Sequence, residues 1–189
     1  MYTLQVITPP ASEPVSVADM HAQLRLNDSS EDALLATYIQ AARETFEKLT
    51  LRTVLPTTYR QHVPYFTSAV TLMMAPVISV NIVNYWDVND SLQIASVKTD
   101  TISLPGTVWM DVYPVTSPNK MPKAYVEYVA GWVNLAAVPA QVRTAIMLLA
   151  AHYYEHRESS TTDILNDVPQ GFKAVCDQYK TGMVGSWGA

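Results

Sequence analysis

The segment SEDALLATYIQAARETFEKLT, residues 30–50, has the clearest periodic pattern in this 189-residue sequence. Its apolar side chains recur every three or four residues, at Leu35, Tyr38, Ile39, Ala42, Phe46 and Leu49. This spacing places them on one face and predicts a long amphipathic helix. Ser30 is the expected N-cap, and Glu31 and Asp32 in the first turn favour the helix dipole.

A shorter helix is predicted before this segment. Ser16 is expected to cap it, Asp19 completes a capping box, and the apolar pattern continues to Leu26. Residues 1–15 contain three prolines and are expected to form an extended lead-in.

Two helices are predicted near the end of the chain. Val138 and Pro139 are expected to begin a long helix, because proline is favoured in a first turn. Its expected buried face is formed by Val142, Ala145, Ile146, Leu149, Ala150 and Tyr153. Pro169 is expected to begin a last short helix that ends near Tyr179.

Residues 54–133 show a different pattern, in which prolines separate short runs rich in Val, Ile, Thr, Tyr and Trp. Such runs are typical of β-strands. The expected strands are Thr57–Val63, Val70–Met73, Val77–Trp86, Ser91–Val97, Val108–Val112 and Ala124–Tyr128. Residues 87–90, Asp-Val-Asn-Asp, are expected to form a hairpin turn.

These elements predict an α+β fold. Two N-terminal helices, one long and one short C-terminal helix are expected to form an antiparallel bundle, with an inserted antiparallel β-domain. Residues 1–180 are expected to form a single domain, with helical parts at 14–53 and 138–180 and the β insertion at 54–133. Residues 181–189 are expected to form a flexible tail.

Charge is scarce and unevenly placed. Charged residues make up 15% of the chain, against about 25% in an average soluble domain. The formal net charge is −5, and residues 1–47, with seven acids and two bases, account for all of it. An acidic chain is not expected to bind nucleic acid tightly. A surface this poor in charge predicts that much of it is covered, most simply by copies of the same chain.

The nearly uncharged middle of the chain has two interpretations. It is either an ordinary β-sandwich or barrel whose surface uses Thr, Ser, Asn and Gln, or a set of subunit contacts, since interface cores are poor in charge and rich in aromatic residues. The expected interface residues are Tyr59, Tyr65, Phe66, Tyr85, Trp86 and Trp109.

The sequence contains one pattern that resembles a catalytic motif. The pattern is H-x-x-E-H, formed by His152, Glu155 and His156. In zinc hydrolases with this pattern, two histidines on one helix face bind the metal and the glutamate acts as base. A zinc hydrolase also needs a third ligand, and the downstream acids lie in a predicted polar loop. The single cysteine, Cys176, is in an apolar helical register and is expected to pack in the core. We therefore expect no enzyme activity, no cofactor and no metal.

Several stretches together resemble the head–tail connector, or adaptor, proteins of long-tailed bacteriophages. They are EPVSVAD at 13–19, LRL at 24–26, EDALL at 31–35, VTLMMAPVISV at 70–80, VEYVAGW at 126–132, Val138-Pro139, AIMLLAAHYYEHRE at 145–158 and VPQGF at 168–172. The landmarks cover nearly the whole chain in the expected order. One departure is the end of the second helix, Leu49-Thr50-Leu51, where similar proteins usually have a glycine.

The resemblance implies a structural virion protein at the head–tail interface, assembled in the host cytoplasm. Such proteins form a homo-oligomeric ring, usually of twelve copies, beneath the portal protein. The ring extends the DNA channel, through which duplex DNA passes without specific binding, and provides a docking surface for the stopper or tail-completion protein. No membrane is involved. The alternative is that this chain is itself a tail-completion or stopper protein.

The resemblance also implies roles for two groups of residues. The expected channel-lining acids are Asp28, Glu31, Asp32, Glu44 and Glu47. The expected portal-binding residues are Lys180, Met183, Val184 and Trp187 in the glycine-spaced tail, which either frays or orders against a partner.

Overall fold

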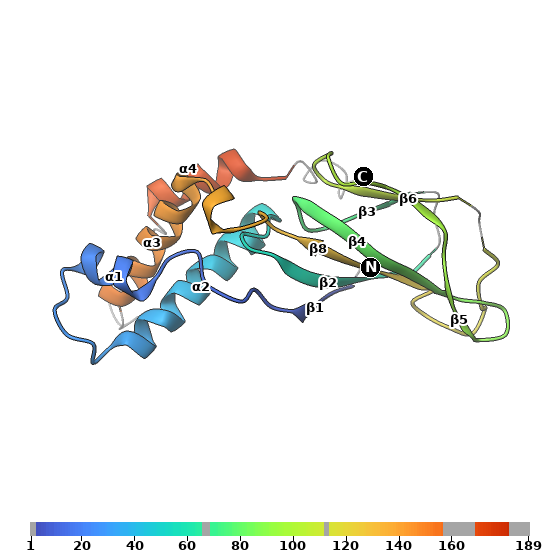
Figure 1. Ribbon diagram of the computed structural model, residues 1–189, viewed down its shortest axis with the longest axis horizontal. Helices are drawn as coiled ribbons and strands as arrows, with labels where there is room; N and C mark the ends of the chain where they lie inside the picture. The colour runs from blue at the N-terminus through green and yellow to red at the C-terminus, as the bar shows by residue number, and fades with distance from the viewer. Residues whose placement is uncertain (1–2, 66–68, 112–113, 157–168, 182–189) are drawn as a thin grey trace, which may run out of the picture. The chain divides into compact units, whose positions relative to one another are not determined.

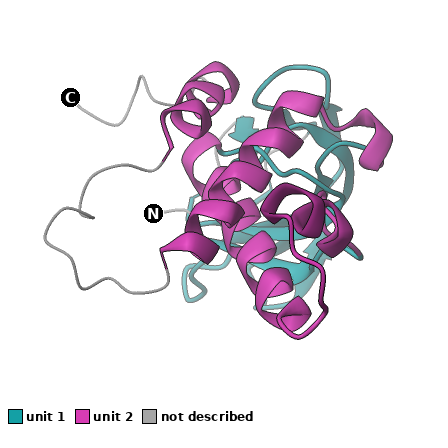
Figure 2. Ribbon diagram, turned by 90° about the vertical axis from the view of Figure 1, so that its left-hand side faces the viewer, with its two compact units in different colours: residues 1–11, 51–133, 181–189 teal, residues 12–50, 134–180 magenta. Residues whose placement is uncertain are grey.

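The computed structural model describes residues 3–65, 69–111, 114–156 and 169–181. The chain divides into two compact units, coloured separately in Figure 2. Unit 1 contains residues 1–11, 51–133 and 181–189, and unit 2 contains residues 12–50 and 134–180. The described residues contain four α-helices and two antiparallel sheets, so the predicted α+β class with antiparallel strands is confirmed.

Unit 2 is helical. It contains α1 (Val17–Leu24), α2 (Asp32–Thr50), a 3-10 turn (Leu135–Ala137), α3 (Ala140–Glu155) and α4 (Gln170–Tyr179). Helices α2 and α3 pack against each other, and α4 packs on both. The beginning of α2 lies beside the end of α3, where the Tyr154 hydroxyl donates a hydrogen bond to Glu31. The predicted stripe of α2 faces inward at Leu35, Ile39, Ala42 and Phe46, whereas Leu49 is exposed.

The helix ends follow local chemistry, with one correction. Ser16 and Asp19 form the predicted capping box at the start of α1. Helix α2 begins at Asp32, two residues after the predicted cap Ser30, whose hydroxyl donates to the Asp28 carboxylate. Leu51, just after α2, has a φ of 55°, in the left-handed region that a C-terminal glycine usually occupies. Glycine adopts this conformation without strain, whereas leucine does so only at a cost.

Unit 1 is a β unit with two sheets, whose strands can be followed in Figure 1. The first has the order β1-β2-β8-β4-β5 and the second the order β3-β7-β6. The strands are β1 (Thr3–Thr8), β2 (Thr57–Val63), β3 (Ala69–Thr71), β4 (Val77–Trp86), β5 (Leu92–Ile94), β6 (Val97–Asp100), β7 (Thr107–Met110) and β8 (Ala124–Ala130). Strands β2 and β4 have the predicted bounds.

One prediction about strands was incomplete and one was wrong. Residues 3–8 are extended as predicted, but they also pair with β2 as an edge strand. Residues 91–97 do not form one strand. The chain leaves the first sheet after β5 and enters the second at β6, so each sheet receives a short strand. Neither pairing can be read from local periodicity, because each depends on residues distant in sequence.

Every second residue along β2 and β8 is buried. These buried side chains form much of the core of unit 1, among them Tyr59, Val63, Val126 and Tyr128. A buried side chain, Gln61, holds the chain between β3 and β4. Its amide donates to the carbonyl of Thr71 at 2.8 Å and accepts from the backbone N–H of Met73 at 2.9 Å. The Tyr128 hydroxyl accepts from the N–H of Met74 at 3.1 Å. These bonds satisfy backbone groups where the strand pairing stops.

Candidate interface surfaces

The first sheet of unit 1 has one face that carries a row of interacting polar and aromatic side chains. Cross-strand partners share a face, and the register places Arg60 opposite Glu127 and His62 opposite Tyr125. Arg60 binds Glu127 at 2.6 and 2.8 Å, and its guanidinium lies 4.7 Å from the centre of the Tyr125 ring. The Asn84 amide donates to the Tyr125 hydroxyl at 2.8 Å. The side chains on this face are therefore held in place by hydrogen bonds and a cation–π contact with one another.

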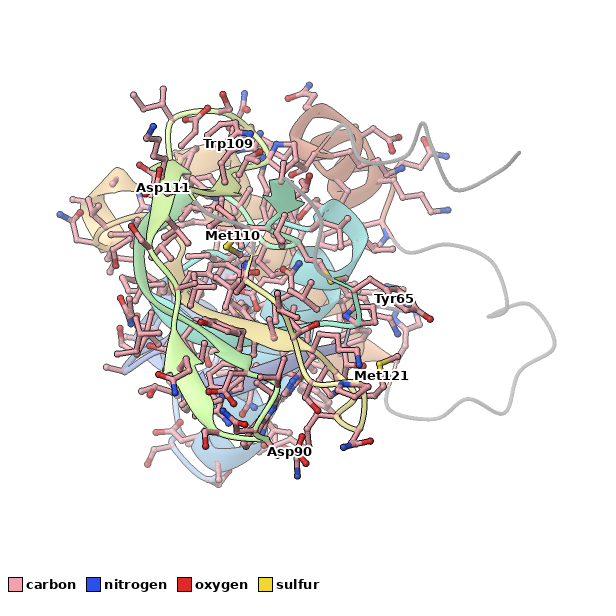
Figure 3. The ribbon with its side chains drawn as sticks, turned by 90° about the vertical axis from the view of Figure 1, so that its right-hand side faces the viewer. Tyr65, Asp90, Trp109, Met110, Asp111 and Met121 are labelled. Atoms are coloured by element: carbon pink, nitrogen blue, oxygen red, sulfur yellow. The ribbon has the colours of Figure 1, made fainter. Side chains whose placement is uncertain are left out.

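One end of unit 1 presents exposed apolar side chains. Tyr65 follows β2 and Met121 precedes β8, and the two segments are held together where the N–H of Lys123 donates to the carbonyl of Val63 at 3.0 Å. Tyr65 is 66% exposed and Met121 is 59% exposed. Both point outward at this end of the unit in Figure 3.

Trp109 forms a second exposed site, on the outer face of the three-stranded sheet. It is the central residue of a cross-strand row, paired with Ala69 on one side and Lys98 on the other. Lys98 lies 3.5 Å from the Asp111 carboxylate, which also accepts from the Ser96 hydroxyl at 2.8 Å. An exposed indole beside a paired lysine and aspartate is a surface that suits a protein partner.

The six predicted interface residues therefore have different environments. Tyr65 and Trp109 are exposed, Tyr85 and Trp86 are half-buried, and Phe66 lies outside the described residues. Tyr59 is 4% exposed and packs in the core of unit 1 with its ring 5.8 Å from that of Tyr128, so it is not available to a neighbour. The alternation of β2 turns it inward.

The predicted channel acids also divide into two groups. Asp28 and Glu44 are exposed; Glu31 and Asp32 are half-buried at the start of α2. The Ser30 hydroxyl and N–H bind Asp28 and hold its pKa below the ordinary value. Asp32 lies 2.6 Å from Nε2 of His21. Glu47 is 7% exposed, and its carboxylate lies 2.8 Å from the Arg43 guanidinium. It is therefore buried and cannot line a channel as predicted.

Of the predicted portal-binding residues, only Lys180 lies within the described part of the chain. It follows α4, is exposed, and its ammonium group lies 2.6 Å from the Asp177 carboxylate, which raises the pKa of Lys180 above its usual value. Met183, Val184 and Trp187 lie outside the described residues.

The H-x-x-E-H segment does not form a metal site within the described residues. No group of three or more His, Cys, Asp or Glu side chains there could hold a metal ion. The His152 and His156 rings lie 4.3 Å apart, and Nδ1 of His156 bonds to the carbonyl of His152 as the helix ends. Cys176 is buried, and burial raises the pKa of its thiol to about 11, which suits a packing residue and not a nucleophile.

No helix in the described part of the chain is both long and apolar enough to cross a bilayer.

Sequence reasoning missed two features of these surfaces. The Arg60–Glu127–Tyr125 arrangement joins strands that are 67 residues apart. The alternation along residues 57–63 signals which side chains share its face, but not which strand pairs with β2. The exposed isoleucines Ile94 and Ile102 were also missed, because an apolar residue in a strand-rich segment is ordinarily expected to be buried.

The fold agrees with comparisons to known proteins. Residues 14–80 match the family model of the phage gp6-like head-tail connector protein. This match confirms the resemblance to head–tail connector proteins and covers α1, α2, β2, β3 and the start of β4. No curated protein matches this chain.

Solved structures with the same fold come from gene transfer agent (GTA) particles. A chain in the neck of an empty GTA particle, with C6 symmetry, is 22% identical, with a TM-score of 0.79 over 95% of each chain. A chain in the virion of a native GTA particle is also 22% identical, with a TM-score of 0.77 over 95% of each chain. A chain in the neck of a native GTA particle, with C12 symmetry, is 20% identical, with a TM-score of 0.69, covering 94% of this chain and 95% of that chain.

Proposed function

We propose that this chain is a ring-forming head–tail connector subunit in the neck of a bacteriophage or phage-like virion. The observation that carries the proposal is the likeness to a neck chain over 95% of both chains, with a TM-score of 0.79. The necks in which such chains occur have C6 or C12 symmetry. A cyclic assembly joins each copy to two neighbours through different surfaces.

The surface chemistry of unit 1 supports a covered, structural role. Its described residues carry as many basic as acidic side chains, and it exposes apolar residues at Tyr65, Trp109 and Met121. Contacts between copies would remove such side chains from water. We therefore assign Tyr65 and Trp109 to subunit contacts, with Phe66, Tyr85 and Trp86 as further candidates. The role is mechanical, and no catalytic step is assigned to any residue.

We further propose that the ring lies beneath the portal and extends the DNA channel. The accessible acids of the helical unit, Asp28, Glu31, Asp32 and Glu44, are the candidates for its lining. Acids repeated around a channel repel phosphates, so duplex DNA slides through without being held. The opposite end of the ring would receive a stopper or tail-completion protein. The site of assembly would be the host cytoplasm.

To test this function, the purified chain is mixed with purified portal rings in one reaction and with purified tails in another. Electron microscopy and native mass measurement should show a closed ring of this chain on the portal, and particles lacking the chain should lose their genome or fail to receive tails. Binding to the tail but not to the portal would instead support the alternative role of a stopper or tail-completion protein. Normal particles without the chain would exclude both roles.

The residues 182–189 are the candidate portal-binding segment, next to Lys180. A variant in which Met183, Val184 and Trp187 are serine keeps the length and the glycines of the segment. It should bind portal at least about tenfold more weakly, since buried apolar anchors carry much of an interface's energy. The matched control, Ser186→Ala, also keeps the length and the glycines and should bind normally. Equal binding of both variants would remove this segment from the proposal.

A further inference from the structure

The five-stranded sheet of unit 1 has two edges, β1 and β5, that have a sheet neighbour on one side only among the described residues. Neither strand contains a charged residue or a proline. Every residue of β1 except Leu4 is exposed, and so are all three residues of β5. Natural edge strands are ordinarily protected by charge, proline or a cover, because their free N–H and C=O groups attract another strand.

Both edges also carry exposed apolar side chains. Val6 is 52% exposed, Leu92 is 44% exposed and Ile94 is 71% exposed. Strand β5 is short, but the chain continues into β6, whose outer edge is also free among the described residues. The edges therefore have the properties of strands that become covered on assembly.

The directions of the two edges determine how copies can join. All neighbouring strands in this sheet are antiparallel, and the sheet has five strands. Strands β1 and β5 therefore run in the same direction. When one copy follows another around an axis along the strands, β5 of the first meets β1 of the second in a parallel pair. This contact joins two different edges, so it can repeat around a ring, whereas β1 against β1 would close after two copies.

The register within the chain also determines on which face of the sheet each edge side chain lies. Thr3 pairs with His62, His62 with Tyr125, Tyr125 with Asn84, and Asn84 with Ile94, so the first and last of these residues share a face of the sheet. Gln5, opposite Arg60, is on that face too. Val6, opposite Tyr59, is on the other face. A sheet continued into the next copy would bring Gln5 and Ile94 to one side and leave Val6 on the other.

We propose that β5 of one copy pairs in parallel with β1 of the next, so that the sheets of unit 1 form a continuous belt in the assembled ring. The partner is a second copy of this chain. This inference rests on the proposed function, which supplies the ring, and it names the strands that join its subunits.

Cysteine cross-linking in the assembled neck tests the pairing. The natural chain has one cysteine, Cys176, which is buried, so the unmodified protein should give no cross-links. After oxidation, a Gln5→Cys/Ile94→Cys variant, with Gln5→Cys/Leu92→Cys for the neighbouring register, should give a ladder of covalent oligomers that ends at the ring size. The matched Val6→Cys/Ile94→Cys variant should give about tenfold less, because thiols on opposite faces of a sheet cannot be bridged. Gln5→Cys alone should give no dimer.

The outcomes separate this inference from the function on which it rests. A ring that forms normally with neither the Gln5–Ile94 nor the Gln5–Leu92 cross-link, or a covalent dimer from Gln5→Cys alone, would overturn the strand pairing and leave the connector role intact. Absence of any ring in the neck would overturn the connector role itself. If a cysteine variant fails to assemble, amide exchange of the natural protein decides. Residues 3–8 and 92–94 should exchange at least about tenfold more slowly in the ring than in the free chain, and unchanged rates would overturn the pairing.

Discussion

Arg43 on α2 binds Glu13, a residue 30 positions earlier in the segment that leads into α1. Nε of Arg43 donates to one glutamate oxygen at 2.7 Å and Nη2 to the other at 3.2 Å, while Nη1 donates to Glu47 at 2.8 Å. Burial alone would lower the pKa of Arg43, but its bonds to the two glutamates raise it above the ordinary value. The guanidinium thus attaches the lead-in to the long helix inside unit 2.

Replacing Arg43 by methionine should destabilise unit 2 by about 3 kcal/mol, because it leaves two carboxylates partly buried without a counter-charge. Urea unfolding followed by circular dichroism measures the change. Lys48→Met is the matched control, since Lys48 is exposed on the same helix and the variant loses the same charge. It should change stability by less than about 0.5 kcal/mol. Equal effects would show that net charge, and not the Arg43 contacts, determines the loss.

Tyr128 should make unit 1 sensitive to alkaline pH. Its ring is buried, and burial raises the pKa of its hydroxyl well above the ordinary value of 10. The unfolded chain releases this proton near pH 10 while the folded chain retains it. The stabilising contribution is therefore complete below pH 10 and is lost as pH rises further, by up to about 1.4 kcal/mol per pH unit.

A Tyr128→Phe variant should lose about 1 kcal/mol at pH 7, because the N–H of Met74 loses its acceptor. Its stability should then decline less steeply than that of the natural protein between pH 10 and 11. Tyr65→Phe, at an exposed position, should keep the natural slope. Denaturant unfolding at a series of pH values measures all three proteins, and parallel slopes for the natural and Tyr128→Phe chains would contradict the prediction.

Two glycines should respond oppositely to alanine. Gly131 has a φ of +129°, and a Cβ there would lie 2.6 Å from the backbone of Leu55. Gly131→Ala should therefore destabilise unit 1 by about 2 kcal/mol or more. In Gly171→Ala the new methyl group would meet nothing closer than Leu148 at 3.8 Å, and the variant should gain about 0.5–1 kcal/mol of helix propensity in α4. Thermal unfolding of both variants tests the opposite signs.

The capping box of α1 can be tested through a single carboxyl group. The Ser16 hydroxyl and N–H bind Asp19 and hold its pKa below the ordinary value. This contribution is present above the ordinary pKa and is lost as pH falls through the folded one. Ser16→Ala should raise the pKa of Asp19 in an NMR titration and cost about 1 kcal/mol. Ser12→Ala, at an exposed position outside the helix, should leave that pKa unchanged.

Much of the fold can be predicted from the sequence where the signal is local. The stripe along residues 35–46, the Ser16–Asp19 box and the alternation of residues 57–63 each depend on neighbours a few residues apart, and the structure contains α1, α2 and β2 where they predict them. The negative charge of residues 1–47 and the scarcity of charge in the middle of the chain can likewise be read directly from the sequence. These features arise because helix and strand periods, together with caps, act over short distances.

The candidate surfaces required the tertiary structure, because exposure depends on strand partners that sequence spacing does not reveal. Tyr59 and Tyr65 look alike in the sequence, but alternation and sheet packing bury the first and expose the second. Glu47 has the appearance of a surface acid on an amphipathic helix until Arg43 covers it. The edge position of β1 was likewise set by its long-range pairing with β2, since a strand's side-chain pattern determines its faces and not its neighbours.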